Sequence, residues 1–176
     1  GWYDKRWMYE ESLKMPFIVS WPGVTKPGSR DHHLIQNIDY AETFLEIAGA
    51  KIPSDMQGRS LVPLLKGQSP NDWRASIYYH YYEYPSFHMV PRHYGIRTER
   101  FKLMHFYRFG NEWEMYDLQK DPDELTNLYG QPGQAKLTAD LKKQLYALQK
   151  HYGDESDLSE MPKEWKDKVR PGTAQK

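Results

Sequence analysis

The 176-residue sequence contains no cysteine, so it can form no disulfide, no thiolate zinc site and no cysteine nucleophile. It has no run of about 18 or more apolar residues, which predicts that no segment spans a membrane. Basic and acidic side chains balance at 24 each. The chain therefore lacks the clustered positive excess that a nucleic-acid surface requires. These absences leave a globular chain with room for one domain, or for one domain and a piece of another.

Aromatic side chains are abundant instead, with 14 Tyr, 6 Trp and 6 Phe. Such rings suit β-strands, and they also suit carbohydrate faces, where stacking meets hydroxyl hydrogen bonding. Packing within a sheet is the simpler explanation, and it accounts for most of them.

The first 23 residues, GWYDKRWMYEESLKMPFIVSWPG, place a cluster of charges before a short apolar run. The run Phe17–Val19 ends in Trp21-Pro22-Gly23, which predicts a buried strand that stops in a turn. The charges before it allow two interpretations. They are either the solvated face of a short amphipathic helix, where single charges contribute little, or they include a fixed cation, Lys5, that faces an anion.

Residues 37–48 have the apolar spacing of a helix that faces a core, with Asn37 as N-cap and Gly49 as its end. The apolar positions of this predicted helix are Ile38, Ala41, Phe44, Leu45 and Ala48. Beyond it, Gly58 is predicted to serve a turn. Three leucines are predicted to pack: Leu61, Leu64 and Leu65.

The second half of the sequence predicts a small α+β domain. Gly, Gln, Ser, Pro and Asn cluster at residues 67–71 and mark a boundary. Four strands are expected at 77–84, 93–98, 101–107 and 112–118. Because they lie close together in sequence, an antiparallel meander is the natural pairing. A helix over residues 134–152 should lie across this sheet. The expected domains are 1–70, 71–152 and a polar tail over 153–176.

Two histidines stand near the second expected strand. His88 and His93 are separated by Pro91, and this spacing cannot place both on one helix face, so a local zinc site is rejected. One interpretation gives His93 a hydrogen bond inside the sheet edge and leaves His88 in a loop. The other has this loop lean over an active-site mouth, where both histidines and Arg92 contact sugar hydroxyls or a second anionic group.

Arg97, in the same expected strand, should bind an acidic partner through its planar guanidinium, with Asp117 and Glu124 both open as candidates. The segment Asn127-Leu128 is expected to turn the chain and fill an apolar gap.

Four ordered segments resemble type I sulfatases of the alkaline phosphatase superfamily. From Lys5 to Gly23 the pattern K-x-x-x-Y-E-E-x-x-K-x-P-x-I-V-x-W-P-G is similar to the segment after the metal-binding Asp-Asn-Gly of that family. Three later segments resemble the rest of the C-terminal region of N-sulfoglucosamine and N-acetylglucosamine-6-sulfatase relatives. They are GRSLVPLL from Gly58, RHYGIRTERFKL from Arg92, and EMYDL with DPDELTNL from Glu114.

The resemblance implies a sulfuric ester hydrolase that acts on sulfated amino sugars or glycosaminoglycan fragments. In that family a formylglycine, made from Cys or Ser in a Cys/Ser-x-Pro-x-Arg motif, attacks sulfur, and calcium bound by Asp and Asn holds the sulfate. Lys5 then takes the position of a sulfate contact, and His88, Arg92 and His93 are the candidates for substrate binding. The family also implies export to the periplasm or the cell exterior.

The sequence departs from the family in one respect, because it contains no Cys/Ser-x-Pro-x-Arg motif and no Asp-Asn-Gly. We therefore expect the C-terminal end of an alkaline-phosphatase-like α/β catalytic domain, followed by a small antiparallel sheet packed by a helix. The calcium ligands and the nucleophile would lie in a missing N-terminal catalytic portion, with no metal ligand in this chain. The chain alone should be inactive and should associate through its exposed apolar surface.

Two other functions stay open at the level of sequence. The chain could be a non-catalytic carbohydrate-binding or assembly module that carries the sulfatase C-terminal domain. It could also belong to a phosphodiesterase or phosphonate hydrolase of the same superfamily, in which case a Thr nucleophile would be expected upstream.

Overall fold

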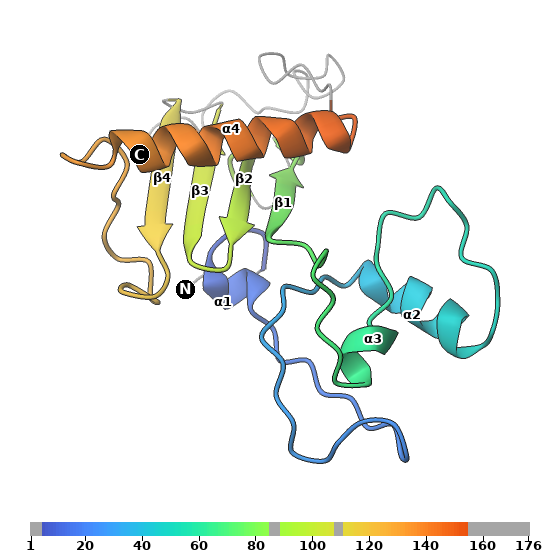
Figure 1. The fold of residues 1–176 in the computed structure, drawn as a ribbon. Coiled ribbons are helices and arrows are strands. Elements are labelled where there is room, and N and C mark those ends of the chain that lie inside the picture. Colours follow the sequence, from blue (N-terminus) through green and yellow to red (C-terminus); the bar gives the residue numbers. More distant parts are fainter. Residues whose placement is uncertain (1–4, 85–88, 108–110, 155–176) are drawn as a thin grey trace. The chain divides into compact units, whose positions relative to one another are not determined.

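A computed structural model describes residues 5–84, 89–107 and 111–154. The chain separates into two compact units, one formed by residues 1–15 with 76–176 and the other by residues 16–75. Figure 1 shows the four strands and the long helix of the first unit, and the short helices of the second.

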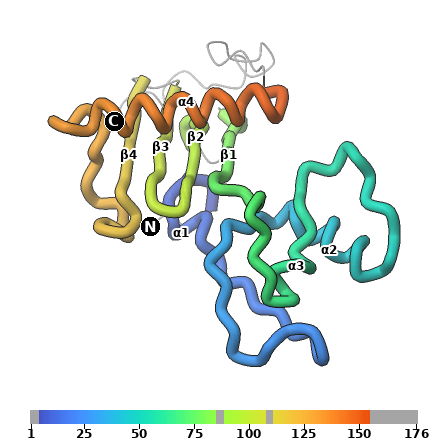
Figure 2. Tube along the Cα trace, in the orientation of Figure 1, coloured from blue at the N-terminus to red at the C-terminus, as the bar shows by residue number. Residues whose placement is uncertain are grey.

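The first unit is built on an antiparallel sheet with the strand order β1-β2-β3-β4 (Figure 2). The strands are β1 Ser76–Tyr81, β2 His93–Thr98, β3 Phe101–Phe106 and β4 Glu112–Asp117. A tight turn joins β2 to β3, where the Phe101 N–H donates to Thr98 Oγ1 at 2.8 Å. The predicted meander is confirmed, because its pairings are local and its strands are rich in aromatic and β-branched residues.

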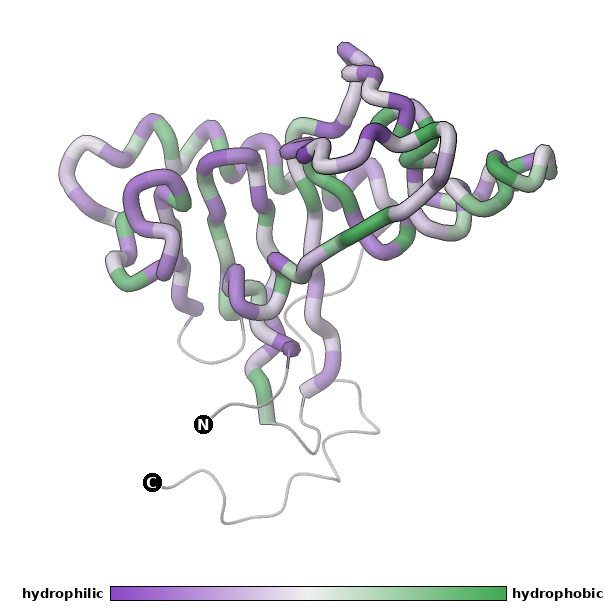
Figure 3. The backbone as a smooth tube through the Cα atoms, turned by 90° about the horizontal axis from the view of Figure 1, so that it is seen from below, coloured by the Kyte–Doolittle hydropathy of each residue, from purple (hydrophilic) through white to green (hydrophobic). Residues whose placement is uncertain are grey.

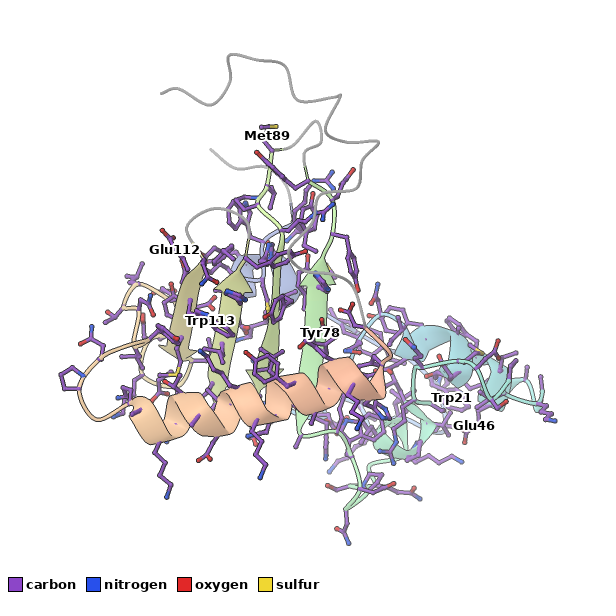
Figure 4. The ribbon with its side chains drawn as sticks, turned by 90° about the horizontal axis from the view of Figure 1, so that it is seen from above. Trp21, Glu46, Tyr78, Met89, Glu112 and Trp113 are labelled. Atoms are coloured by element: carbon purple, nitrogen blue, oxygen red, sulfur yellow. The ribbon has the colours of Figure 1, made fainter. Side chains whose placement is uncertain are left out.

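Helix α4, Ala135–His151, covers one face of the sheet and runs across the strands (Figure 1). Leu141 and Leu145 are buried in a core shared with the strands. The strand residues of this core are Tyr94, Ile96, Leu103 and Met115. Tyr78 and Trp113 pack against the same core from the two outer strands (Figure 4). The predicted helix and its position are both confirmed, and with them the α+β class.

The opposite face of the sheet is covered by residues 5–15, which include the short helix α1, Glu10–Leu13. Met8 has no exposed surface and packs with Met104, Phe106 and Tyr116. Gly95 of β2 makes this contact possible, since a Cβ at that position would lie 2.6 Å from Met8 Sδ. Both faces of the sheet are therefore buried, one by α4 and the other by the N-terminal segment.

The second unit holds α2, Asp39–Ile47, and α3, Val62–Leu65. Its core contains Leu61, Leu64 and Trp73, with Leu65 partly buried against them. This confirms the predicted packing of the three leucines. The carboxylate of Asp39 is buried in the same unit and accepts hydrogen bonds from Nη1 and Nη2 of Arg74.

The prediction that the helix stripe faces a core is wrong for the described part of the chain. The helix begins at Asp39. Its N-cap position is Ile38 and not the predicted Asn37, and no side chain makes a capping hydrogen bond there. Its buried residues are Asp39, Glu42 and Thr43, whereas Phe44 is 69% exposed. The polar face is buried because its side chains form hydrogen bonds with the backbone of neighbouring segments. For example, Thr43 Oγ1 accepts a hydrogen bond from the Leu61 N–H at 2.8 Å.

The predicted strand at Phe17–Val19 does not form, and Ile18 is 91% exposed. All three residues of the segment are apolar, and hydrophobic residues are drawn in green along the tube of Figure 3. A strand needs a neighbour that satisfies its backbone groups, and none of the described strands pairs with this segment.

The role predicted for Gly58 is also wrong. A Cβ at this position would collide with the Ile38 carbonyl and the Glu42 carboxylate. Gly58 therefore allows close approach of the chain to α2, and a turn conformation is not what requires it.

Candidate functional site

Histidine and aromatic side chains gather at one end of the sheet, where β1 and β3 end and β2 and β4 begin. Tyr81 pairs with His93, and His93 pairs with Phe106. One position further along, the row is His80, Tyr94, His105 and Trp113. Since successive residues of a strand point to opposite faces, the first row faces residues 5–15 and the second row faces α4.

The predicted site residues are distributed unevenly around this end. Arg92 and His93 are both buried at the start of β2. Lys5 is exposed, and its Nζ donates to the backbone carbonyl of Glu11 at 2.9 Å. His88 lies outside the described residues.

The imidazole of His93 is packed among four aromatic rings. Trp7, Tyr79, Tyr81 and Phe106 place their centroids between 5.1 and 5.8 Å from it. Its Nδ1 lies 2.8 Å from the Pro91 carbonyl, which can only accept, so Nδ1 carries the proton. Burial lowers the pKa of His93 to about 4. At neutral pH the ring is therefore uncharged, and its Nε2 is buried with no hydrogen-bond partner among the described residues.

The segment that carries Lys5 is attached to this same end of the sheet. Trp7 stacks on His93 at 5.8 Å, and the Tyr79 hydroxyl donates to the Arg6 carbonyl at 2.9 Å. Burial raises the pKa of Tyr79 to about 12, which keeps this donor protonated. The structure thus brings the chain around Lys5 next to the start of β2 at His93.

A buried ionic cluster fixes the next part of that segment. Lys102 has no exposed surface, and its Nζ lies 2.9 Å from Glu10 Oε1 and 2.7 Å from Glu124 Oε1. Arg97 Nη2 lies 3.1 Å from Glu10 Oε2. The backbone N–H of Glu10 donates to Glu124 Oε2 at 2.6 Å. We call Glu10, Arg97, Lys102 and Glu124 the buried ionic cluster.

The prediction for Arg97 was wrong, because its partner is Glu10 and neither Asp117 nor Glu124. Asp117 instead accepts from Arg100, with Nη2 to Oδ2 at 2.6 Å. Glu124 faces Lys102. The acceptor lies 87 positions earlier in the chain, and no spacing rule for a single strand identifies such a partner.

The pKa values of the two carboxyl groups in the cluster shift in opposite directions. Burial by itself would raise the pKa of Glu10, but hydrogen bonds from Arg97 and Lys102 bring it below its ordinary value. For Glu124 burial is the larger effect, and its pKa is raised despite Lys102. Glu10 is therefore the carboxylate that stays charged over the wider range of pH.

The sequence carried one signal for this cluster that was not used. Strand alternation places Lys102 on the same face as Met104 and Phe106, which are apolar and buried. A lysine on a buried face requires anionic partners, because an unpaired buried charge is strongly unfavourable.

A second polar cluster lies on the α4 side. Asp154 Oδ2 accepts from His80 Nδ1 at 2.6 Å, from the Tyr82 hydroxyl at 3.1 Å and from the Tyr78 hydroxyl. His80 Nε2 lies 2.9 Å from the Tyr107 hydroxyl. Burial lowers the pKa of His80, and Asp154 opposes the shift. These bonds tie Asp154, three residues beyond the end of α4, to β1, and His80 connects β1 to Tyr107, the residue after β3.

Within residues 5–84, 89–107 and 111–154, no three His, Asp or Glu side chains gather in a way that could hold a metal ion. None of the helices in these ranges is long and apolar enough to cross a membrane.

Comparison with known proteins defines the class of the chain. Residues 1–151 match the family described as N-sulphoglucosamine sulphohydrolase, C-terminal, and the chain belongs to this family. The sulfatase resemblance found in the sequence is thereby confirmed.

Among individual relatives, the chain is 51% identical over 156 residues to an N-acetylglucosamine-6-O-sulfatase of Bacteroides thetaiotaomicron, covering 88% of this chain and 28% of that protein. It is 33% identical over 172 residues to an ulvan-active sulfatase of Formosa agariphila, covering 81% of this chain and 34% of that one. A protein solved in complex with its substrate D-glucosamine-2-N,6-O-disulfate superposes with a TM-score of 0.86 at 48% identity, over 92% of this chain and 33% of that chain. The chain thus spans about a third of these relatives' length or less.

Proposed function

We propose that the chain is the C-terminal portion of a sulfatase that hydrolyses sulfate esters of sulfated amino sugars, such as glycosaminoglycan fragments. The observation that carries this proposal is the 51% identity to an N-acetylglucosamine-6-O-sulfatase over 156 residues. The solved relative in complex with a disulfated glucosamine supports the same substrate class.

Within this function, Lys5 is the proposed sulfate contact. Its ammonium is a compact point charge suited to a tetrahedral oxyanion. The side chain is exposed, and the segment that follows it is held against the sheet by Trp7 and Glu10. A cation in a fixed position can neutralise charge that develops on the sulfate without reorganising during the reaction.

The loop before β2 is the proposed rim of the substrate pocket, with His88 and Arg92 as contacts to sugar hydroxyls or a second anion. His93 belongs to this rim through its bond to the Pro91 carbonyl, which fixes the end of the loop. A neutral His93 adds no positive charge at this position.

Formylglycine and calcium would supply the nucleophile and the sulfate-binding cation, as the family implies. We place both in the N-terminal portion, because this sequence contains neither the Cys/Ser-x-Pro-x-Arg motif nor the Asp-Asn-Gly that the family uses for them. Lys5 and the rim are then this chain's own contribution to the reaction. By the same resemblance, we propose export to the periplasm or the cell exterior.

The first test is the full-length polypeptide with Lys5→Ala, assayed on a 6-O-sulfated glucosamine. Loss of one preplaced cation typically removes about 2.7–4 kcal/mol of transition-state stabilisation, so kcat/KM should fall by roughly a hundredfold to a thousandfold. Lys136→Ala, an exposed lysine on α4, is the matched control and should keep wild-type activity. An unchanged kcat/KM for Lys5→Ala would remove Lys5 from the site.

The isolated chain of 176 residues should show no turnover of the same substrate. Measurable hydrolysis by these residues alone would contradict the placement of nucleophile and metal in another part of the protein. Parallel assays of the full-length enzyme on phosphate and phosphonate esters distinguish a sulfatase from the phosphonate hydrolase alternative. Tight binding of a sulfated glycan by the isolated chain would favour the carbohydrate-binding module.

A further inference from the structure

The ammonium of Lys5 is oriented by a backbone carbonyl. Lys5 Nζ donates to the Glu11 carbonyl at 2.9 Å, in the first turn of α1. Helix α1 has only four residues, so its own hydrogen bonds give it little stability. The position of the Glu11 carbonyl must therefore be set by what holds the neighbouring residue in place.

That neighbour, Glu10, is held at its backbone and at both of its carboxylate oxygens. Its N–H donates to Glu124 Oε2 at 2.6 Å. Oε1 lies 2.9 Å from Lys102 Nζ, and Oε2 lies 3.1 Å from Arg97 Nη2. One hydrogen bond to the backbone and two ion pairs to the carboxylate thus hold Glu10 and the start of the peptide that follows it.

The partners of Glu10 are themselves rigid. Lys102 lies in β3 with no exposed surface, and Arg97 lies in β2. Glu124 is buried in the loop after β4. Lys102 also binds Glu124 at 2.7 Å, so the two groups that hold Glu10 hold each other. Displacement of one member of this network would leave a buried charge without its partner, which is strongly unfavourable.

We propose that Glu10, Lys102 and Glu124 are positioning residues for Lys5, through which the C-terminal sheet sets the direction of the sulfate-contacting ammonium. This inference rests on the proposed function, in which Lys5 contacts the sulfate. The residues of the cluster do not touch the substrate themselves. They act through the Glu11 carbonyl, which receives one of the three N–H donors of Lys5.

The test uses the full-length enzyme with Glu124→Gln, which keeps the shape of the side chain and weakens its bonds to Lys102 and to the Glu10 N–H. Displacement of a catalytic group by a fraction of an ångström to one ångström lowers rates by about tenfold to a hundredfold. We expect kcat/KM to fall by that factor, with weaker inhibition by inorganic sulfate. Arg97→Met, which removes a partner nearer the surface, is the second variant and should show a smaller loss in the same direction.

A double-mutant cycle distinguishes positioning from general destabilisation. If Glu124 acts through Lys5, then Glu124→Gln should cost nothing further in the Lys5→Ala enzyme, and the two losses should not add. Arg100→Met is the matched control, because it breaks another ion pair of the β2–β3 hairpin, with Asp117, that does not include residues 5–15. That variant should leave both kcat/KM and sulfate inhibition unchanged.

Additive losses for Lys5→Ala and Glu124→Gln would overturn the positioning role while leaving the proposed function intact. If the full-length enzyme is active and Lys5→Ala leaves its kcat/KM unchanged, both the sulfate contact and the positioning that depends on it are overturned. A full-length protein with no sulfatase activity would refute the proposed function at the wild-type stage, before any variant is compared.

Discussion

The imidazole of His93 is a base whose buried environment disfavours its protonated, charged form. The ring is enclosed by aromatic side chains, and its pKa is lowered from 6.5 to about 4. In the unfolded chain the same residue takes a proton near its ordinary pKa. The folded state therefore binds fewer protons than the unfolded state between these two values of pH.

This difference predicts that the free energy of unfolding decreases as the pH falls from 6.5 toward 4. The unfolded state gains a proton in this window and the folded state does not, so the loss from His93 approaches roughly 3 kcal/mol and then levels off below pH 4. Denaturant unfolding at pH 7 and pH 5 measures the effect. His93→Gln, which keeps an N–H donor, should lessen the dependence on pH.

Two other buried histidines contribute in the same direction, since burial also lowers the pKa of His80 and His105. His93→Gln should therefore remove one proton from the pH dependence of the free energy of unfolding, and part of that dependence should remain. His151→Gln, at the exposed end of α4, is the matched control, because this side chain is not enclosed as His93 is. Identical pH profiles for wild type and His93→Gln would show that His93 is not the buried neutral group described here.

Single residues also mark the limit of what the sequence could predict. The role of Asn127 was predictable, since a turn residue bonds nearby backbone, and its Oδ1 accepts from Met115 and Tyr129 as its Nδ2 donates to Trp113. The partner of Arg97 was not predictable. Local chemistry requires an acid but does not say which one, and the acid comes from a segment far away in the chain.

Among the elements, the four strands and α4 were predicted to within one residue at each end, except that β1 ends at Tyr81, three residues before its predicted end, because each depends on contacts close in sequence. The hairpins join neighbours, and α4 has its own apolar stripe with Leu141 and Leu145 buried. The N-terminal segment was interpreted differently. Its packing on the second face of the sheet depends on Met8 fitting against Gly95, and a pattern in residues 5–15 alone cannot reveal that surface.

This contact predicts a large cost for a single methyl group at residue 95. In Gly95→Ala the new Cβ meets Met8 Sδ and the Leu103 carbonyl, and overpacking of this kind costs about 1–3 kcal/mol. Thermal or denaturant unfolding of the chain measures the loss. If Met8 packs over Gly95, the Met8→Ala change should relieve part of this clash. The double variant Met8→Ala/Gly95→Ala should then be less destabilised than the sum of the two single variants.

The compensation is expected to be incomplete, because removal of the Met8 side chain leaves the clash with the Leu103 carbonyl in place. Met8→Ala alone should cost about 2–5 kcal/mol, as other buried Met→Ala changes do. Strict additivity of the two changes would mean that Met8 does not lie over Gly95.

At the scale of the whole molecule, the unit formed by residues 16–75 carries an exposed apolar surface. Ile18 is 91% exposed and Phe44 69%, and Phe17, Ile38 and Ile47 are exposed as well. Large exposed apolar patches mark surfaces that bind other protein. In relatives of which this chain spans about a third or less, further polypeptide is available to cover such a surface.

We therefore predict that the isolated chain self-associates. The double variant Ile18→Asp/Phe44→Asp should shift sedimentation profiles toward the monomer, because a charged side chain disfavours burial in an apolar interface. Leu125→Asp is the matched control: Leu125 is 82% exposed but lies in the other unit, and its replacement should leave association unchanged. A wild-type chain that is monomeric at high concentration would contradict the prediction.

The same surface explains why sequence patterns failed for Phe17–Val19 and for the stripe on α2. Both patterns are those of buried elements, and they were interpreted as such. The described residues leave both segments exposed, so the pattern indicates burial that these residues do not supply. In the proposed full-length enzyme, Ile18→Asp and Phe44→Asp are expected to lower the free energy of unfolding. In the isolated chain the same changes are expected to reduce self-association.

The first unit takes its residues from two separated stretches of the chain, and this has a consequence for the order in which it can form on the ribosome. Glu10 is separated by 87 positions from Arg97 and by 114 from Glu124. At about 5–20 residues per second, translation needs roughly 4 to 17 s to add the first of these partners and roughly 6 to 23 s to add the second. For that interval Trp7, Met8 and Glu10 have emerged without the sheet they will cover. Closure of this unit must therefore be a late event in biosynthesis, completed only after the loop that follows β4 has left the exit tunnel.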